Sequence, residues 1–300
     1  MKDCIILIRK KNKLMSIKSF FRRSLKKNKS LFFVKNFEEL KKLDKELSRT
    51  KVLGLDTEFD WRTTYFPKLS LIQIVANSKL FLIDCLTIDP REVLKKYLES
   101  ENYLKIFHSV RSDATVLSKS MNIHSLSVFD IQVADQLLSQ SNIRSYGKIV
   151  KSFFGIELKK SETNSNWLKR PLTQNQIKYA FDDIDFLIEI YGYQKKKLTK
   201  IGILKQALSK SEEEAVLGNS SLKKLRLERQ KNSLSQKDQK IFLWREEVAE
   251  QENVPPAYIF KDKHIKHLSK IGIEDEFAKK KILKILGDSL TTEIFMKRFL

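Results

Sequence analysis

The segment VLGLDTEFD, residues 52–60, constrains the fold more than any other part of the sequence, because an apolar run carries Asp56 and Glu58 two positions apart. Side chains of a strand alternate between its faces, so these two carboxylates share one face. Two neighbouring, partly buried carboxylates are unfavourable unless positive charge lies between them. Arginine partners, with Arg62 and Arg111 as candidates, a shared proton or a divalent cation would each relieve the repulsion.

The composition permits a sizeable core and indicates a polyanionic partner. The chain has 300 residues, of which 41% are apolar, and a formal net charge of +21. That length accommodates one large domain or two modest ones. The positive charge is typical of proteins that bind nucleic acid or an anionic surface, although a lysine-rich proteome would produce the same bias. No apolar run approaches the roughly 18 residues of a membrane span, so we expect a soluble protein without a membrane partner. We also expect a monomer.

Two features concern the cellular setting. Cys4 and Cys85 are the only cysteines and lack CxxC spacing, which excludes a disulfide scaffold and a cysteine zinc site and favours the cytoplasm. Residues 1–30 contain 11 Lys/Arg and one acid. This basic N-terminal extension is interpreted in three ways: an arm that holds phosphates, a targeting segment, or an artefact of translation that truly starts at Met15.

The pattern of apolar residues divides the rest of the chain. Strand-like runs at 30–34, 51–59, 69–75, 79–84 and 104–109 are interspersed with helical segments at 36–50, with a capping-box pattern at Asn36 and Glu39, and at 92–100. From there to 208 the period is mostly helical, which predicts an α/β domain over 31–208 with a mixed sheet. A polar stretch over 209–235 is predicted as a linker with some helix, and residues 236–300 as an all-α domain.

Further acids lie where they could join the first pair. Asp113 follows a strand near the start of a predicted helix. Tyr179 and Asp183 stand at i and i+4, on one face of a helix, although spacing alone also permits Asp182. Four carboxylates gathered from several elements suit two divalent cations, which bind oxygen ligands and act on phosphodiesters.

These segments together resemble the ribonuclease D family of DEDD 3′–5′ exonucleases. LDTEFDWRTTYFPKLSLIQI is similar to the first exonuclease motif, FHSVRSD to the second, and YAFDDIDFL to the third in its Tyr-x₃-Asp form. The resemblance covers residues 31–205 and implies an RNase H-like fold. It also implies two Mg²⁺ or Mn²⁺ ions held by the four acids Asp56, Glu58, Asp113 and Asp183, with Tyr179 orienting the attacking water.

Each assignment has a structural alternative. Asp113 could be a first-turn acid that interacts with the helix dipole, Tyr179 could be core, and Asp183 could be a solvated helix residue. Asp130 resembles a family position that supports the site, although helix capping explains it equally well.

Substrate contacts are expected from four other side chains. Trp167 and Arg170 lie in a loop where they could stack on and neutralise a single-stranded 3′ end; the alternative for Trp167 is a loop anchor packed on the core. The other two candidates lie on strands: Gln73, which could instead satisfy backbone groups, and His108, which could be a packing residue.

The C-terminal segment FLWREEVAEQENVPPAYIF resembles the HRDC domain, a helical module that binds nucleic acid or protein. Trp244, Arg245 and the Asn253–Pro255 turn carry the resemblance. The whole pattern predicts a metal-dependent 3′–5′ exoribonuclease that trims RNA such as tRNA precursors. The alternatives are a 3′–5′ DNA exonuclease and a catalytically inactive nucleic-acid-binding protein.

Overall fold

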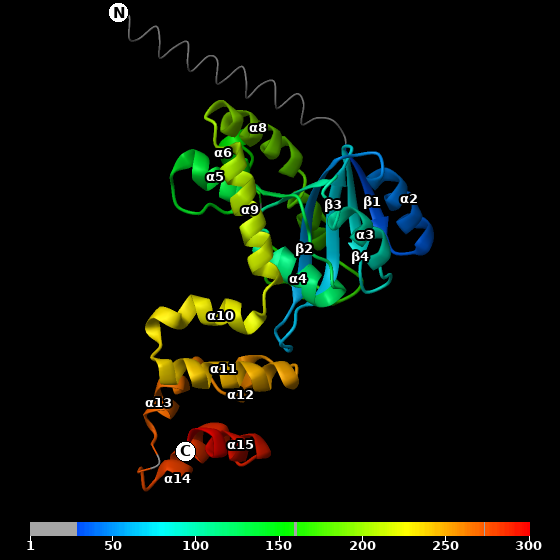
Figure 1. Ribbon diagram of the computed structural model, residues 1–300. Helices are drawn as coiled ribbons and strands as arrows, with labels where there is room; N and C mark the ends of the chain where they lie inside the picture. The colour runs from blue at the N-terminus through cyan, green and yellow to red at the C-terminus, as the bar shows by residue number, and fades with distance from the viewer. Residues whose placement is uncertain (1–28, 159–160, 273) are drawn as a thin grey trace, which may run out of the picture. The chain divides into compact units, whose positions relative to one another are not determined.

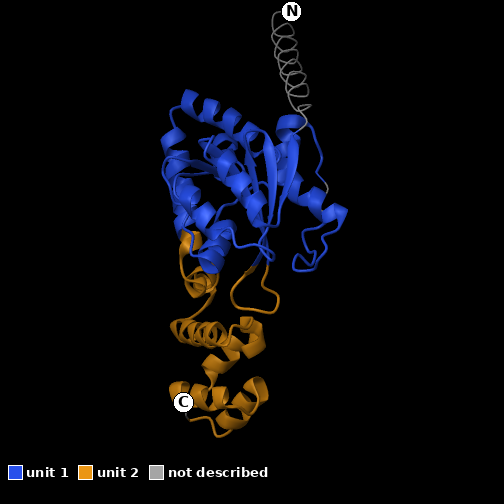
Figure 2. Ribbon diagram, turned by 90° about the vertical axis from the view of Figure 1, so that its right-hand side faces the viewer, with its two compact units in different colours: residues 1–59, 69–216 blue, residues 60–68, 217–300 orange. Residues whose placement is uncertain are grey.

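The computed structural model describes residues 29–158, 161–272 and 274–300, and these form two units. The first consists of residues up to Phe59 together with Leu69–Val216, and the second of Asp60–Lys68 together with Leu217–Leu300 (Figure 2). Residues 1–28 of the predicted extension lie outside the described residues. Lys29 and Ser30 belong to the first unit: Ser30 begins the first strand, and Lys29 Nζ lies 2.9 Å from carboxylate oxygens of both Asp185 and Glu189.

The first unit is built on a six-stranded mixed sheet with the order β1-β4-β3-β2-β5-β6 (Figure 1). β1 pairs with β4, β2 with β5 and β5 with β6 in parallel, whereas β3 and β4 are antiparallel. The strands are β1 (Ser30–Val34), β2 (Val52–Asp60), β3 (Lys68–Ala76), β4 (Lys79–Asp84), β5 (Leu104–Phe107) and β6 (Val128–Asp130).

Helices cover both faces of this sheet. Alternate strand residues face two apolar clusters, because successive side chains point to opposite sides. The first cluster contains α2 (Phe37–Leu47), α3 (Arg91–Leu98) and α4 (Arg111–Met121). The second contains residues of α5 (Ile131–Ser139), α6 (Tyr146–Phe154), α7 (Gln174–Asp182) and α8 (Leu187–Lys200). This arrangement confirms the predicted α/β class.

Most predicted elements of this unit are present, with two informative differences. Asn36 caps α2 by accepting from Glu39 N, but the Glu39 carboxylate accepts from Lys35 N and not from the backbone of Asn36, so the expected reciprocal capping box is shifted by one residue. The three-residue strand β6 was not expected, because a strand of that length carries no periodicity.

The predicted linker over 209–235 is mostly helical. α9 (Leu204–Asn219) continues through the acidic run 212–214, and α10 (Leu222–Gln230) follows. The acids have partners in the first unit: Glu214 pairs with Arg111, and Glu212 accepts from the amide of Val128 at the start of β6. Polar composition therefore concealed a helix that packs as far as residue 216 within the first unit.

The second unit contains residues 236–300, for which a helical domain is predicted, together with residues 217–235 and a loop from between β2 and β3. Its helices are α10, α11 (Gln236–Gln251), α12 (Pro256–Ile259), α13 (Ile265–Lys270), α14 (Ala278–Leu286) and α15 (Leu290–Phe299), with 3₁₀ turns at Lys231–Ser233 and Asp262–His264. Trp244 packs against Phe260, Phe295 and Phe299. Asn253 Oδ1 accepts from the amides of Tyr65 and Phe66, at 3.2 Å each, and so anchors the loop. Within the described ranges, no helix combines the length and apolarity needed to cross a membrane.

Candidate active site

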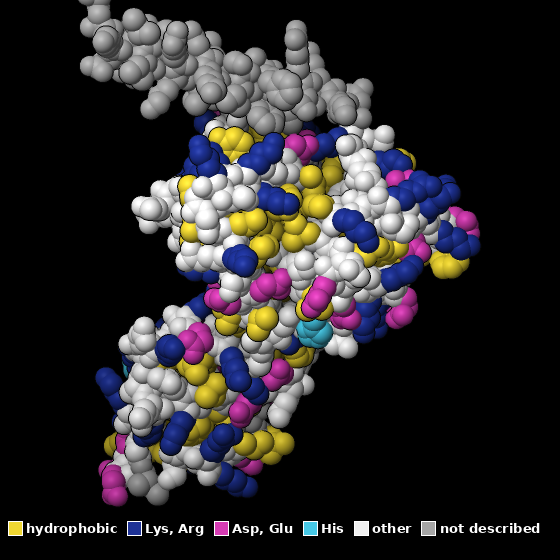
Figure 3. All heavy atoms as spheres, turned by 45° about the horizontal axis from the view of Figure 1, so that its top comes forward, with side chains coloured by type: hydrophobic (Ala, Val, Ile, Leu, Met, Phe, Trp, Pro, Cys, Tyr) yellow, Lys and Arg dark blue, Asp and Glu magenta, His cyan; other side chains and the backbone are white. Residues whose placement is uncertain are grey.

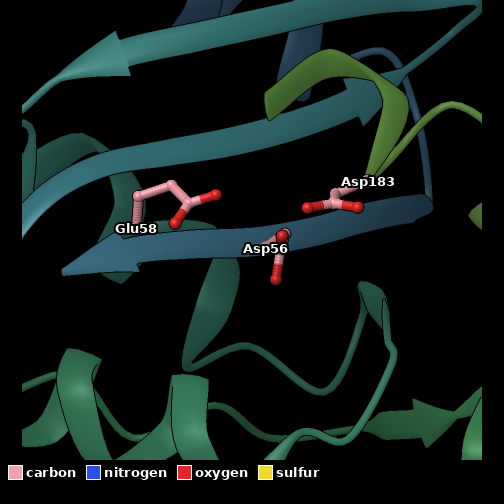
Figure 4. A group of neighbouring side chains, drawn as sticks. All are labelled: Asp56, Glu58 and Asp183. Atoms are coloured by element: carbon pink, nitrogen blue, oxygen red, sulfur yellow. The ribbon is translucent and has the colours of Figure 1, made fainter. Parts of the chain in front are cut away.

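Three of the predicted acids come together on one face of the sheet. Asp56 and Glu58 project from β2, as their spacing requires, and Asp183 stands directly after α7 (Figure 4). One oxygen from each carboxylate lies within 4.8 Å of the others. All three side chains are half-buried. A strand and a segment that follows it much later in the chain thus build one cluster of negative charge.

Gly54 permits this approach. It lies two residues before Asp56 and therefore on the same face of β2. A Cβ atom at this position would lie 2.5 Å from Val75 Cγ1 and 3.1 Å from Leu187 Cβ, at the first residue of α8. Because glycine lacks that atom, the start of α8 can pack directly on β2. Asp183, four residues before Leu187, is thereby brought to the strand.

Asp113 lies beside this cluster but outside its tight group of three. It is 4% exposed, and its Oδ1 accepts a hydrogen bond of 2.6 Å from Thr57 Oγ1. Thr57 lies between Asp56 and Glu58 in the strand, so its side chain leaves β2 on the other face. Asp113 is also an acid in the first turn of α4. It can therefore interact with the helix dipole and still lie near the other acids.

Asp130 fixes the turn from which α4 begins. Its carboxylate accepts from the amides of Ser109 and Val110, at 2.9 and 2.8 Å, and it also caps α5 by accepting from Gln132 N at 2.8 Å. Ser109 has a φ of 63°, a conformation that needs such support. The same carboxylate of Asp130 therefore both caps α5 and supports the turn that leads into α4.

The arginine alternative for the acid pair fails. Arg62 pairs with Asp60, and Arg111 forms two hydrogen bonds of 2.7 Å with Glu214. Among the described residues, no Lys, Arg or His nitrogen lies within 4 Å of a carboxylate oxygen of Asp56, Glu58 or Asp113. A group of oxygen ligands lacking a protein cation is the donor set that hard divalent ions prefer. The site therefore fits divalent metal.

The raised pKa values of the acids also indicate that the cluster lacks a positive charge. Burial, followed by the charges of Asp113 and Asp183, raises the pKa of Asp56 well above its usual range. Burial and the charge of Asp183 raise the pKa of Glu58 to about 9, and burial raises the pKa of Asp113 to about 7. A bound cation favours the ionised carboxylates and reverses these shifts.

We expect this coupling to appear as pH-dependent stability. A carboxyl whose folded pKa exceeds its unfolded value binds more protons in the folded state, so the free energy of unfolding falls as pH rises between the two values. For Glu58 that window runs from 4.5 to about 9. In EDTA, urea unfolding at pH 5 and pH 9 should show a loss on the order of 2 kcal/mol that Glu58→Gln reduces. Saturating Mg²⁺ should remove most of this loss. An equal loss of unfolding free energy between pH 5 and pH 9 in wild type and Glu58→Gln would contradict the coupling.

Tyr179 faces Asp183 across one helical turn. Both residues line the same cavity, and burial, followed by the charge of Asp183, raises the pKa of the Tyr179 phenol. The neighbouring Asp182 is paired with Lys178 instead. Asp183 rather than Asp182 therefore joins the cluster, as the resemblance to the family's Tyr-x₃-Asp motif implied. Thr163 also lines that cavity, and the sequence does not mark it, because a loop threonine carries no pattern that shows where it lies.

Gln73 neither faces a substrate nor bonds to backbone groups, the two roles expected from the sequence. It is fully buried on β3, and its Nε2 lies 3.4 Å from Glu58 Oε1, so it donates to the carboxylate. It satisfies no backbone group, and burial leaves it no surface for substrate. Gln73 is a positioning residue for Glu58.

A cavity of 340 Å³ opens over the acids. Besides Asp56, Glu58, Tyr179 and Asp183, its lining includes Leu55, Thr57, His108, Ser145, Tyr146, Gly147, Leu158 and Thr163. His108 Nε2 lies 3.2 Å from the carbonyl oxygen of Arg144 and the same distance from Gln132 Nε2. Burial lowers the pKa of His108, so its imidazole is neutral at pH 7. His108 thus borders the cavity, as a substrate contact would, while its ring nitrogen is held by protein groups.

Trp167 and Arg170 anchor their loop to the core. Trp167 is 3% exposed and packs in the apolar cluster that contains α7 and α8. Arg170 forms two hydrogen bonds, of 2.7 and 2.6 Å, with the buried carboxylate of Asp84, and a third with the carbonyl of Trp167. These contacts favour the anchoring alternative over stacking on a 3′ end, because the indole has no free face.

Comparison with known proteins agrees with this geometry. Residues 31–199 match the 3′–5′ exonuclease domain, and residues 239–278 match the HRDC domain. Ribonuclease D of Desulfotalea psychrophila is 31% identical over 240 residues, which are 75% of this chain and 63% of that protein. Ribonuclease D of Xanthomonas oryzae is 33% identical over 155 residues, 52% of this chain and 43% of that protein. The chain thus spans less than two thirds of the length of these relatives.

Solved structures show the same fold. Escherichia coli RNase D superimposes with a TM-score of 0.74 at 22% identity, over 89% of this chain and 72% of that one. The catalytic core of RRP6 from Trypanosoma brucei gives a TM-score of 0.65 at 22% identity, over 90% of this chain and 78% of that one. The chain therefore belongs to the 3′–5′ exonuclease family, is similar to ribonuclease D, and carries a match to the HRDC domain after its exonuclease domain.

Proposed function

We propose that the protein is a 3′–5′ exoribonuclease that uses two divalent metal ions and releases nucleoside 5′-monophosphates from RNA 3′ ends. One observation carries the proposal: Asp56, Glu58 and Asp183 converge in a cavity that Tyr179 also lines. Asp113 stands next to them without a cationic partner. The match to ribonuclease D over most of the chain supports RNA as the substrate.

The four acids would hold the metal. When bound, divalent cations polarise the scissile phosphate, activate water and stabilise the leaving 3′ oxygen. The chain's own contribution is to keep the carboxylates in place: Gln73 donates to Glu58, and Thr57 donates to Asp113. The Tyr179 phenol has a raised pKa, so it is neutral at pH 7 and acts as a hydrogen-bond donor, not as a base. It would orient the attacking water.

Maturation of tRNA 3′ ends is the setting that we propose for this activity. The net charge of +21 suits a structured RNA substrate, and the Escherichia coli RNase D of the same fold is described as an exoribonuclease involved in structured RNA processing. The free thiol of Cys85 fits a reducing cytoplasm.

A time course on 5′-labelled single-stranded RNA tests the proposal. With Mg²⁺ or Mn²⁺ we expect a ladder that shortens from the 3′ end, and with EDTA no shortening. A 3′-phosphorylated RNA, which lacks the free hydroxyl end, and a DNA of the same sequence serve as controls. Faster degradation of the DNA would establish the DNA exonuclease alternative, and binding without degradation of either strand would establish an inactive binding protein.

Replacing Tyr179 by phenylalanine should slow this hydrolysis without removing it. The phenol orients water but holds no metal, so we expect kcat to fall by about 10- to 100-fold, the range typical of groups that orient metal-site ligands. Mg²⁺ affinity should stay unchanged in a calorimetric titration. Tyr258→Phe, at an exposed tyrosine of the second unit, is the matched control. An unchanged rate for Tyr179→Phe would make that tyrosine a core residue.

A further inference from the structure

A lysine-rich surface lies at the end of α8 and the start of α9. Residues 190–206 contain five lysines and no acid. The five side chains, here called the lysine strip, are all exposed: Lys195, Lys196, Lys197, Lys200 and Lys205. In the described part of the chain, none of the five lies within 4 Å of a carboxylate oxygen. Many other lysines of this unit do have acidic partners, so this is a local excess of uncompensated positive charge.

Aromatic side chains support part of the strip. Lys197 Nζ lies 4.6 Å from the ring centre of Tyr193, and Lys195 Nζ lies 5.7 Å from that of Tyr191. Lys196, Lys197 and Lys200 follow Tyr193 by three, four and seven positions, so they share its side of α8. The ammonium groups of these two lysines thus lie over aromatic rings while both residues stay exposed.

The strip is connected to the cavity by two parallel helices. At the cavity end the phenol of Tyr146, in the first turn of α6, accepts a hydrogen bond of 3.1 Å from the amide of Phe186. Seven residues further along each helix, Phe153 packs edge-on against Tyr193, with ring centres 4.8 Å apart. The helices therefore remain in contact for about 10 Å, at 1.5 Å per residue.

The distance from the cavity fits an extended substrate. Phe186 stands three residues after Asp183, and Lys200 ends α8 fourteen residues beyond Phe186. Along α8 the strip thus begins about 14 Å beyond Phe186, at Lys195, and reaches about 21 Å beyond it at Lys200. Figure 3, which brings forward the end of the first unit where Figure 1 shows α8, shows Lys and Arg side chains over this face.

From this arrangement, and resting on the proposed function, we infer that the lysine strip binds the phosphates of single-stranded RNA upstream of the 3′ end held in the cavity. Positive charge without acidic partners attracts a polyanion. RNA fits better than an anionic membrane, because the strip stands on the helix pair that frames the cavity. The strip therefore acts on substrate affinity and leaves the chemical step unchanged.

Neutralising three of these lysines tests the inference. The variant Lys196→Gln/Lys197→Gln/Lys200→Gln is compared with Lys41→Gln/Lys42→Gln/Lys45→Gln, which removes the same charge from α2 on the opposite face of the sheet. Binding of a 5′-labelled 20-nucleotide RNA is measured by anisotropy in EDTA at 50–300 mM salt. For a single strand, each lost phosphate contact lowers the slope of log K against log salt by about 0.7. The slope of the strip variant should therefore fall by about 2, and its binding should weaken about tenfold.

Kinetics separate the strip from the active site. With Mg²⁺, the strip variant should show a KM about tenfold higher on the 20-nucleotide RNA, an unchanged kcat, and wild-type rates on a trinucleotide too short to reach the strip. Equal salt slopes for the strip variant and the α2 control would overturn the inference. So would loss of binding to phosphatidylserine vesicles with RNA binding intact, which identifies a membrane surface. A wild type inactive on every RNA would refute the proposed function. The salt slopes measured by anisotropy would still show whether the lysine strip binds RNA.

Discussion

Asp183→Asn is expected to abolish hydrolysis of RNA, with kcat reduced by at least about a thousandfold. The substitution keeps the size of the side chain but removes a negative oxygen from the group formed with Asp56 and Glu58. Loss of a ligand costs several kcal/mol of transition-state stabilisation by the metal, and 1.4 kcal/mol corresponds to about tenfold in rate. Asp56→Asn should have an effect of similar size.

The adjacent residue is the matched control. Asp182 carries the same charge at the end of the same helix, but it pairs with Lys178 and lies outside the cluster. Asp182→Asn should therefore retain a kcat within about twofold of wild type, because a surface ion pair contributes little. Circular dichroism and Mg²⁺ titration of both variants establish that the fold is intact and that only Asp183→Asn loses affinity. Near-normal turnover of Asp183→Asn would refute the metal assignment.

Replacing Arg170 by leucine should destabilise the exonuclease unit by about 3–5 kcal/mol, the cost of leaving a buried carboxylate without its partner. Asp84 is 2% exposed and receives two hydrogen bonds from the guanidinium. The same guanidinium donates to the carbonyl of Trp167 and the hydroxyl of Ser70, so three groups lose contacts in one substitution.

Urea unfolding at pH 7 measures this effect, and two further variants interpret it. Lys169→Leu changes the exposed neighbouring residue and should alter stability by no more than about 0.5 kcal/mol. Adding Asp84→Asn to Arg170→Leu removes the unpaired charge and should recover part of the loss. A cost for Arg170→Leu as small as that of Lys169→Leu would show that Arg170 is free to contact substrate instead.

The predictable part of the site consists of side chains whose chemistry depends on local spacing. Asp56 and Glu58 alternate with apolar residues on one strand, and Tyr179 and Asp183 stand one helical turn apart. Both spacings translate directly into a shared face, and the structure places them as the sequence predicts. Resemblance of the three motifs to ribonuclease D supplied the remaining acid, Asp113.

Contacts between distant segments were beyond sequence reasoning. Nothing in a buried strand glutamine shows that it donates to Glu58, and nothing in a loop arginine shows that it meets Asp84, 86 positions earlier in the chain. The strand β6 was missed for the same reason, since its three residues are stabilised by β5 and by Glu212 and not by any local pattern.

The sequence by itself determined the class of fold, the acids and their order along the chain, because strand alternation, helical period and charge act over a few residues. Only the tertiary structure decided which groups neutralise or hold those acids: Arg62 and Arg111 are engaged elsewhere, Thr57 holds Asp113, and Gly54 admits α8 to the sheet. These outcomes depend on close packing and hydrogen-bond geometry between segments far apart in the chain, and such geometry exists only once the chain has folded.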